Sequence, residues 1–154
     1  SPGICMVTRG PGATNAAIGV HAAMQDSAPM LLFVGQVGTD MTGREAFQEV
    51  DYGQMFGKIA KRVVTLAEPE RVAEQMASAI CCALSGRPGP VVIVLPDDRL
   101  MLESEAAPVA PAAIASPAPA PAAMAELADE LGGWDVLGLT LREMASEERR
   151  RASR

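Results

Sequence analysis

Short runs of consecutive apolar residues recur along the first hundred residues, and each run is bounded by glycine, proline or polar residues. The clearest runs are residues 4–8, 30–34 and 91–95, and a further strand-like run covers 62–66. Continuous rather than alternating apolar runs are typical of strands that are buried on both faces of a parallel sheet. The pattern therefore predicts four strands, three of them buried on both faces.

Helical patterns separate these runs, so strands and helices alternate along the chain. Such alternation predicts an α/β fold with an open, mainly parallel sheet and helices on both faces. Proline at position 69 suits the first turn of a helix, where its missing N–H has no helical partner to lose. The expected helices are 13–25 after a turn at 9–12, a weaker one at 45–56 that Gly53 interrupts, and a strong one at 70–84.

Ligands of an open parallel sheet bind at the carboxyl ends of its strands. In this sequence those ends carry three segments, Gly10-Pro11-Gly12, Gly35-Gln36 and Pro96-Asp97-Asp98. We expect a binding site where these segments meet.

The composition changes after residue 100, where a long stretch becomes dominated by alanine and proline. Proline fixes the backbone and prevents a helix from continuing, so such a stretch predicts a semi-rigid, extended linker. We expect a first domain at 1–100, a linker at 101–123, and a last segment at 124–154 that is either the start of a further domain or disordered. Because the chain opens with Ser1 directly on an apolar segment, we also expect a piece of a longer protein.

The charge balance excludes some classes of function. Thirteen Lys and Arg residues against nineteen Asp and Glu residues give a net charge of −6, which argues against nucleic-acid binding. No apolar run is long enough for a transmembrane helix, so no membrane partner is expected. Three cysteines and one histidine show no zinc spacing, which predicts a cytoplasmic protein without a structural metal.

The glycine-containing turn at 10–15 has two readings. Glycines between a strand and a helix are typical of dinucleotide sites, but here Asn15 occupies the third glycine position and no acidic residue follows the second strand. The structural alternative is a tight turn in which Thr14 or Asn15 caps the helix.

Other candidates also have structural alternatives. Phe47 could form a ligand wall, although by spacing alone a core anchor is favoured. Arg87 could clamp an anion, or more commonly counter the carbonyl-rich end of the preceding helix. Asp97 and Asp98, as neighbours on an extended segment, would point to opposite sides, which argues against joint acid–base work. No nucleophile–base set can be argued.

Taken together, five segments of residues 2–98 resemble the pyrimidine-binding N-terminal domain of thiamine-diphosphate enzymes, in particular acetolactate synthase and its relatives. Each segment alone is a weak signal, whereas all five in this order and at matching spacing are specific. The segments are Gly10-Pro-Gly-Ala-Thr-Asn15, Gln25-Asp-Ser-Ala-Pro29, Gly35-Gln-Val37, Ala46-Phe-Gln-Glu49 and Gly86-Arg-Pro-Gly-Pro90.

The resemblance implies roles for individual residues. Beside the aminopyrimidine ring it places Gly10, Pro11, Gly12, Asn15 and Gln48. It places Phe47 and Lys61 on the substrate side. Near FAD, in those members that carry the flavin, it places Ser27 and Arg87.

The resemblance also implies a thiamine-diphosphate-dependent enzyme that decarboxylates a 2-oxo acid and joins the product to an acceptor, as in branched-chain amino acid biosynthesis. It implies Mg²⁺ held through a separate C-terminal domain, and a homo-oligomer with its site between subunits. The family's glutamate, which protonates the pyrimidine, is expected before residue 1, and no Gly-Asp-Gly segment is present. We therefore expect an inactive chain with an uncovered sheet edge.

Three alternatives stay open. The chain could be a non-catalytic interaction module that pairs with a full-length relative. It could belong to a related decarboxylase, because Asp97 stands where acetolactate synthases usually have lysine. Dinucleotide binding is the third and least favoured alternative.

Overall fold

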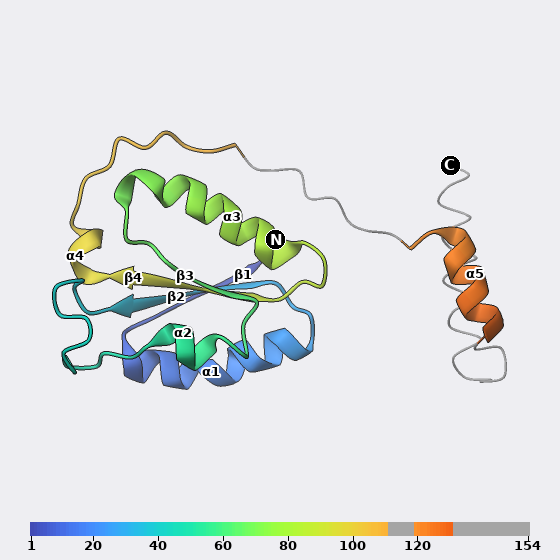
Figure 1. Ribbon diagram of the computed structural model, residues 1–154, viewed down its shortest axis with the longest axis horizontal. Coiled ribbons are helices and arrows are strands. Elements are labelled where there is room, and N and C mark those ends of the chain that lie inside the picture. Colours follow the sequence, from blue (N-terminus) through green and yellow to red (C-terminus); the bar gives the residue numbers. More distant parts are fainter. Residues whose placement is uncertain (111–118, 131–154) are drawn as a thin grey trace. The chain divides into compact units, whose positions relative to one another are not determined.

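A four-stranded, all-parallel sheet forms the centre of the first part of the chain (Figure 1). In this computed structural model, residues 1–110 and 119–130 are described. The spatial order of the strands is β1-β2-β4-β3. Their bounds are β1 Gly3–Val7, β2 Met30–Gln36, β3 Arg62–Thr65 and β4 Pro90–Pro96. The predicted fold class, an open parallel sheet in an α/β arrangement, is confirmed.

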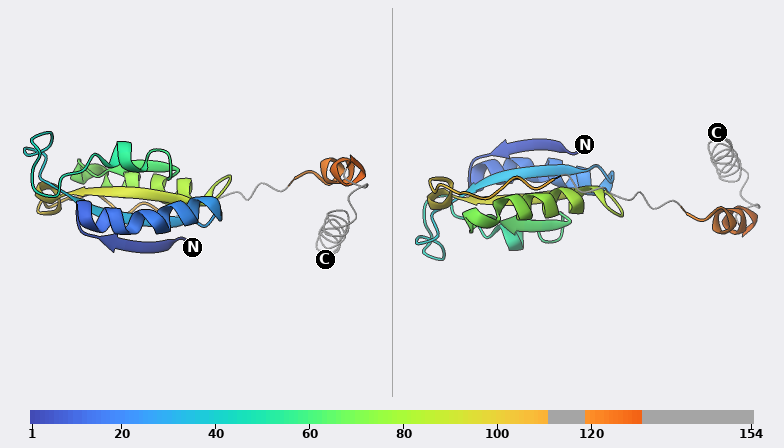
Figure 2. Two further views of the ribbon diagram at one scale, coloured as in Figure 1. Left: turned by 90° about the horizontal axis from the view of Figure 1, so that it is seen from below. Right: turned by 90° about the horizontal axis from the view of Figure 1, so that it is seen from above.

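Helices cover both faces of the sheet, which lies between two helix layers in Figure 1 and is seen from each of these layers in turn in Figure 2. The helices α1 (Gly10–Gln25) and α2 (Tyr52–Phe56) lie on one face. The helix α3 (Val72–Leu84) lies on the other face and follows a 3-10 turn, η1 (Pro69–Arg71). A short helix, α4 (Asp97–Leu100), follows β4 directly.

Two hydrophobic cores result, one on each side of the sheet. Successive residues of a strand point to opposite faces. Leu32 accordingly packs in the core beneath α1 and α2, while its neighbour Leu31 packs beneath α3. The same alternation holds in β4, where Val92 and Ile93 lie in different cores and are both fully buried. Coverage on both faces explains why the central strands read as continuous apolar runs.

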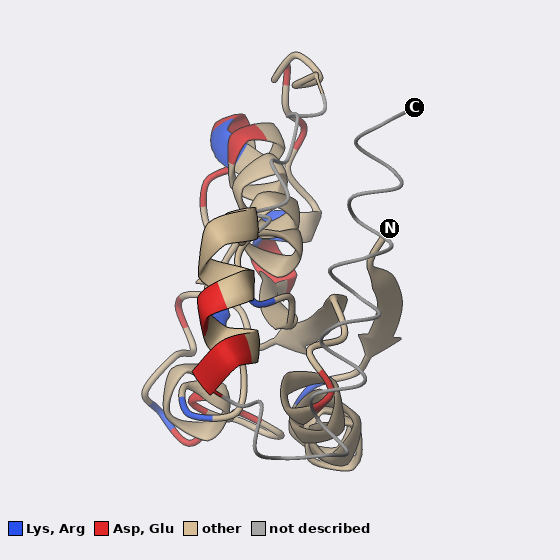
Figure 3. Cartoon of the chain, turned by 90° about the vertical axis from the view of Figure 1, so that its right-hand side faces the viewer, with Lys and Arg blue, Asp and Glu red and all other residues tan. Residues whose placement is uncertain are grey.

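β1 departs from the prediction that its run is buried on both faces. Ile4 and Met6 are each 69% exposed, while Cys5 and Val7 pack against the core beneath α1. The reason is position, because β1 is an edge strand that pairs only with β2 and lies beyond the cover of α3. β1 and α1 also contain no charged residue, and β1 is uniformly tan beside the N label in Figure 3.

The start of α1 corrects the predicted turn at 9–12. The helix begins at Gly10, with Pro11 in its first turn, where the missing N–H costs no hydrogen bond. Capping by Thr14 or Asn15 is also wrong, since no side chain caps this helix. The hydroxyl of Thr14 instead donates to the carbonyl of Gly10, one turn back.

The predicted helix at 45–56 is mostly a loop, and only Tyr52–Phe56 is helical. Glu45 and Gln48 adopt φ values of 53° and 66°, which a helix cannot contain. Asp51 then starts α2, because its carboxylate accepts the N–H of Gln54 as an N-cap.

Beyond α4, the described residues contain one more helix. The chain divides into two compact units, Ser1–Ser116 and Pro117–Arg154. In the second unit the described helix is α5, Pro121–Glu130, which begins inside the predicted linker. The expectation for 124–154 falls largely on residues 131–154, which lie outside the described residues. Within the described parts, no helix is both long and apolar enough to cross a membrane.

Candidate functional site

The segments expected at the carboxyl edge of the sheet do meet there. The N–H of Gly10, at the start of α1, donates to the carbonyl of Gln48 over 3.1 Å. The side-chain Nε2 of Gln36, at the end of β2, donates to the carbonyl of Val50 over 2.7 Å. The loop between β2 and α2 is thereby held against both α1 and β2.

Close packing at the start of α1 explains its glycines. A Cβ atom on Gly10 would lie 2.9 Å from Cγ2 of Val50 and 3.0 Å from the carbonyl oxygen of Gln48. A Cβ on Gly12 would lie 2.9 Å from Cβ of Val7, in the strand that precedes the helix. All three distances are below ordinary contact, so glycine lets the helix, β1 and the loop approach one another.

Two side-chain amides, one on α1 and one in the loop, lack an internal partner within the described part of the chain. Within residues 1–110 and 119–130, no hydrogen bond engages the side-chain amide of Asn15 or Gln48. Asn15 is exposed and lies five residues along α1 from Gly10, and Gln48 is half-buried. Phe47, next to Gln48, is 80% exposed. The favoured reading of Phe47 as a core anchor is therefore wrong, because its loop turns the ring outward.

The same loop is fixed by residues that the sequence patterns did not single out. The hydroxyl of Tyr52 donates to the carbonyl of Gly35 over 3.0 Å, and burial raises the pKa of this phenol. The carboxylate of Glu49 accepts the N–H groups of Gly43 and Ala46. The signal for Tyr52 was weak, since a lone tyrosine resembles any core aromatic.

Asp97 and Asp98 start a short helix rather than an extended segment, which corrects the prediction. They nevertheless have separate partners. Asp97 pairs with Arg9 over 2.9 Å. Asp98 accepts the N–H of Thr39 over 2.9 Å and its hydroxyl over 2.6 Å. Those bonds from Thr39 hold the pKa of Asp98 below its usual value.

Three residues with predicted cofactor or substrate roles lie elsewhere, in loops that precede strands and so at the amino edge of the sheet. Arg87 donates to Ser27 Oγ over 2.8 Å and to two carbonyls in the last turn of α1, both over 2.9 Å. Lys61 donates to the carbonyls of Cys82 and Ser85, at the end of α3. The positive charge of Arg87 therefore counters the carbonyl groups at the end of α1 rather than those of α3, the helix that precedes it. Lys61 binds the carbonyl groups at the end of α3. The structure does not bring these residues to Gly10 and Gln48.

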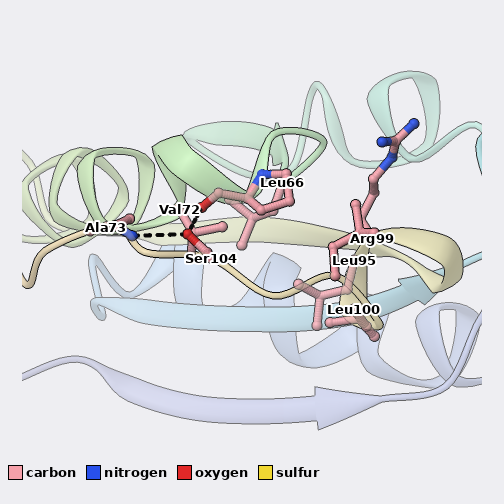
Figure 4. A pocket seen from close by; sticks show the side chains of 10 residues that line it. Leu66, Val72, Ala73, Leu95, Arg99, Leu100 and Ser104 are labelled. Atoms are coloured by element: carbon pink, nitrogen blue, oxygen red, sulfur yellow. Dashed lines mark hydrogen bonds between the residues drawn. The ribbon is translucent and has the colours of Figure 1, made fainter.

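Among the cavities formed by the described residues, two adjoin the ends of the strands. One, of about 530 Å³, is lined by the loop 39–53 and the ends of β2, β3 and β4. The other, of about 420 Å³, is mainly apolar and lies between α3, β4 and residues 100–106 (Figure 4). In Figure 4 the guanidinium of Arg99 is directed away from the leucines that line this second cavity.

The described residues do not offer a metal centre. Among them, no group of three or more His, Cys, Asp and Glu side chains is arranged to hold a metal ion.

Part of the chain is similar to known proteins of one family. Residues 1–55 match the family model for the thiamine pyrophosphate enzyme, N-terminal TPP binding domain. The chain is 44% identical over 96 residues to a probable acetolactate synthase large subunit of Methanocaldococcus jannaschii, which covers 62% of this chain and 16% of that protein. It is 42% identical over 98 residues to the acetolactate synthase isozyme 3 large subunit of Escherichia coli, covering 64% and 17%.

A third relative gives the same picture. The acetolactate synthase large subunit of Lactococcus lactis is 44% identical over 101 residues, covering 66% of this chain and 18% of that protein. The matched region of this chain thus spans less than a fifth of the length of these curated relatives.

Proposed function

The amino-terminal part of this chain is related to the N-terminal TPP-binding domain of thiamine pyrophosphate enzymes of the acetolactate synthase kind, and on that premise we propose that it binds the aminopyrimidine ring of thiamine diphosphate. The proposed binding residues are the helix start Gly10-Pro11-Gly12 together with Asn15 and Gln48. Phe47 lies on the side where a substrate would approach.

The observation that supports this proposal is the contact between Gly10 and Gln48. It joins the start of α1 to a loop that is 38 positions further along the chain, in the direct hydrogen bond of 3.1 Å. The side-chain amides of Asn15, which is exposed, and of Gln48, which is half-buried, have no hydrogen-bond partner among the described residues. The glycines at 10 and 12 let the start of α1 lie directly against the loop and β1.

The donor set fits a neutral aminopyrimidine. Such a ring presents an amino donor and ring-nitrogen acceptors, and a carboxamide can both donate and accept. Thiamine diphosphate itself supplies the electron sink for chemistry at a carbonyl carbon, and the protein orients it. The roles proposed for this chain are to bind the ring, to fix its orientation and to present Phe47 toward the substrate.

The described residues do not fit Mg²⁺, since they hold no metal-binding cluster, so a Mg²⁺ ion would be held by other residues. FAD stays a prediction from resemblance. The guanidinium of Arg87 already donates hydrogen bonds to Ser27 and to the end of α1, and no step of the proposed function uses the flavin. Lys61, which caps α3, likewise takes no part in it.

For the whole protein, we propose a 2-oxo acid substrate such as pyruvate, with decarboxylation followed by transfer to an acceptor. We also propose that the active form is a homo-oligomer. The first proposal rests on the relatives, which are named acetolactate synthases, and the second rests on the family resemblance alone.

Parallel titrations of the full chain with three ligands test the binding proposal. Isothermal calorimetry with thiamine diphosphate, with its isolated aminopyrimidine half and with NAD would compare the three ligands under one set of conditions. We expect binding of the first two and none of NAD. Binding of NAD alone would favour the dinucleotide alternative and contradict the proposal.

The exposed side of β1 supports a second candidate, an interaction module that pairs with a full-length relative. Ile4 and Met6 present apolar surface on an open edge strand, an arrangement that natural sheets usually cover. Gel filtration of the chain with and without an acetolactate synthase large subunit tests it. Co-elution is expected for such a module, and separate elution at micromolar concentrations would contradict it.

A further inference from the structure

The loop that carries Phe47 and Gln48 has an unusual backbone. Three of its residues have positive φ, namely Gly43 at 79°, Glu45 at 53° and Gln48 at 66°. For residues other than glycine this region of the backbone map is sparsely populated and energetically unfavourable. Specific contacts are therefore needed to hold the loop in this form.

Glu49 supplies those contacts. Its Oε1 accepts the N–H of Gly43 over 2.6 Å, and its Oε2 accepts the N–H of Ala46 over 3.0 Å. The N–H of Glu49 in turn donates to the carbonyl of Ala46 over 2.9 Å. Among the described residues, no other side chain forms a hydrogen bond with the main chain of 43–48. The carboxylate thus closes the loop on itself.

The surroundings of Glu49 are anchored on both sides. The carbonyl of Gln48 accepts the N–H of Gly10, and the carbonyl of Val50 accepts the side chain of Gln36. The base of the loop is therefore held by α1 and β2, while its tip depends on the Glu49 carboxylate. A change at Glu49 would release the tip, with Phe47 and Gln48, without removing either anchor.

Glu49 is poorly suited to transfer protons itself. Both of its oxygens are occupied by main-chain donors, and these donors hold its pKa below the usual value for glutamate. A general acid at neutral pH requires the opposite shift. The carboxylate is suited to remain charged and to hold its donors.

Building on the proposed function, we infer that Glu49 is a positioning residue: its carboxylate holds the loop 43–48 in the form that presents Gln48 to the aminopyrimidine ring. It acts through Gln48 and does not contact the cofactor. The chain offers a matched control, Glu45, which lies in the same loop, is exposed, and has a carboxylate with no hydrogen bond to any residue described.

The experiment compares Glu49→Gln with Glu45→Gln in the full chain, since both changes remove one negative charge from one loop. Three quantities are measured: amide hydrogen exchange at Gly43 and Ala46, affinity for thiamine diphosphate, and melting temperature. For E49Q we expect exchange at both amides to rise about fivefold and affinity to fall by about the same factor, as for a lost charge-assisted hydrogen bond at a partly exposed site. For E45Q we expect all three quantities to match the parent chain.

The melting temperature separates positioning from general stability. The loop lies outside both cores, so E49Q is expected to melt only a few degrees below the parent chain and to bind more weakly at temperatures where both are fully folded. Equal affinity and equal exchange in E49Q and the parent would overturn the inference, and so would equal losses in E49Q and E45Q. If the parent chain itself fails to bind thiamine diphosphate, the proposed function falls and the positioning role falls with it.

Discussion

Replacing Gly10 by alanine would disturb the junction on which the proposed site depends. The added Cβ would lie 2.9 Å from Cγ2 of Val50 and 3.0 Å from the main-chain oxygen of Gln48. Val50 can relieve the first contact by a small movement of its side chain, but the second contact involves main chain. The loop must therefore shift away from α1, which lengthens the hydrogen bond from the N–H of Gly10.

The magnitude follows from two opposing terms. Overpacking of a tightly packed position costs about 1–3 kcal/mol. Replacement of glycine by alanine also restricts the unfolded chain, which returns about 0.4–1 kcal/mol. The net expectation is a loss of about 1–2 kcal/mol in the free energy of unfolding.

Gly19 provides the matched control, because it lies in the same helix and a Cβ there would meet nothing within 4 Å. Gly19→Ala should therefore be stabilising by about 0.5–1 kcal/mol, through helix propensity alone. Urea denaturation of the parent chain and of both variants measures the free energies. Amide chemical shifts of Gln48 report the loop.

The reasoning would be refuted if Gly10→Ala were as stable as Gly19→Ala and left the Gln48 amide unshifted. In that case the close approach of helix and loop would not exist in solution. A loss of stability in both variants would point instead to a general intolerance of α1 to alanine.

Three further predictions concern other contacts. Arg87→Ala should lower the free energy of unfolding by about 1 kcal/mol, measured by urea denaturation, because it removes the bonds to Ser27 and to the end of α1. Tyr52→Phe should cost about 1 kcal/mol in the same assay, because it removes the hydroxyl bond to β2. The pKa of Asp98 is lower in the folded chain than its ordinary value of 3.8, so its contribution to stability is present above that value and is lost as pH falls through the folded pKa. NMR titration should accordingly show the amide of Thr39 constant at neutral pH and shifting only in the acid range, and a shift near neutrality would contradict this.

The parts of the fold that local sequence could predict are those set by apolar periodicity. The central strands could be recognised from the sequence because helices cover both faces of the sheet, as in β4, where every residue from Val91 to Val94 is buried. β1 has the same apolar character, yet Ile4 and Met6 are exposed, because a strand's place at the edge is decided by its neighbours in space.

Loops were less predictable, for a physical reason. The stretch 45–51 has helix-forming residues, but the Glu49 carboxylate binds main-chain N–H groups three and six positions back and diverts it from a helix. Side-chain bonds of this kind compete with helix formation and depend on geometry that periodicity does not encode. The prediction of Phe47 as a core anchor is wrong for the same reason, because the exposure of its ring follows from the loop conformation that these bonds hold.

The candidate site was predictable in part. The rule that ligands bind at the carboxyl ends of parallel strands brought the segments at 10–12, 35–36 and 96–98 together, and the structure does likewise, through Gly10, Gln36 and Arg9–Asp97. The sequence alone did not reveal that Lys61 and Arg87 are used at helix ends, because a cation's partner can lie far away in the chain.

The most direct test of the central claim is a residue-resolved NMR titration of the isotope-labelled chain with thiamine diphosphate. The account predicts that shifts concentrate on the amides of Gly10 and Gly12 and on the side-chain amides of Asn15 and Gln48, while Lys61 at the opposite edge stays unchanged. Shifts confined to the surroundings of Lys61 and Arg87, or no shifts at millimolar ligand, would contradict it.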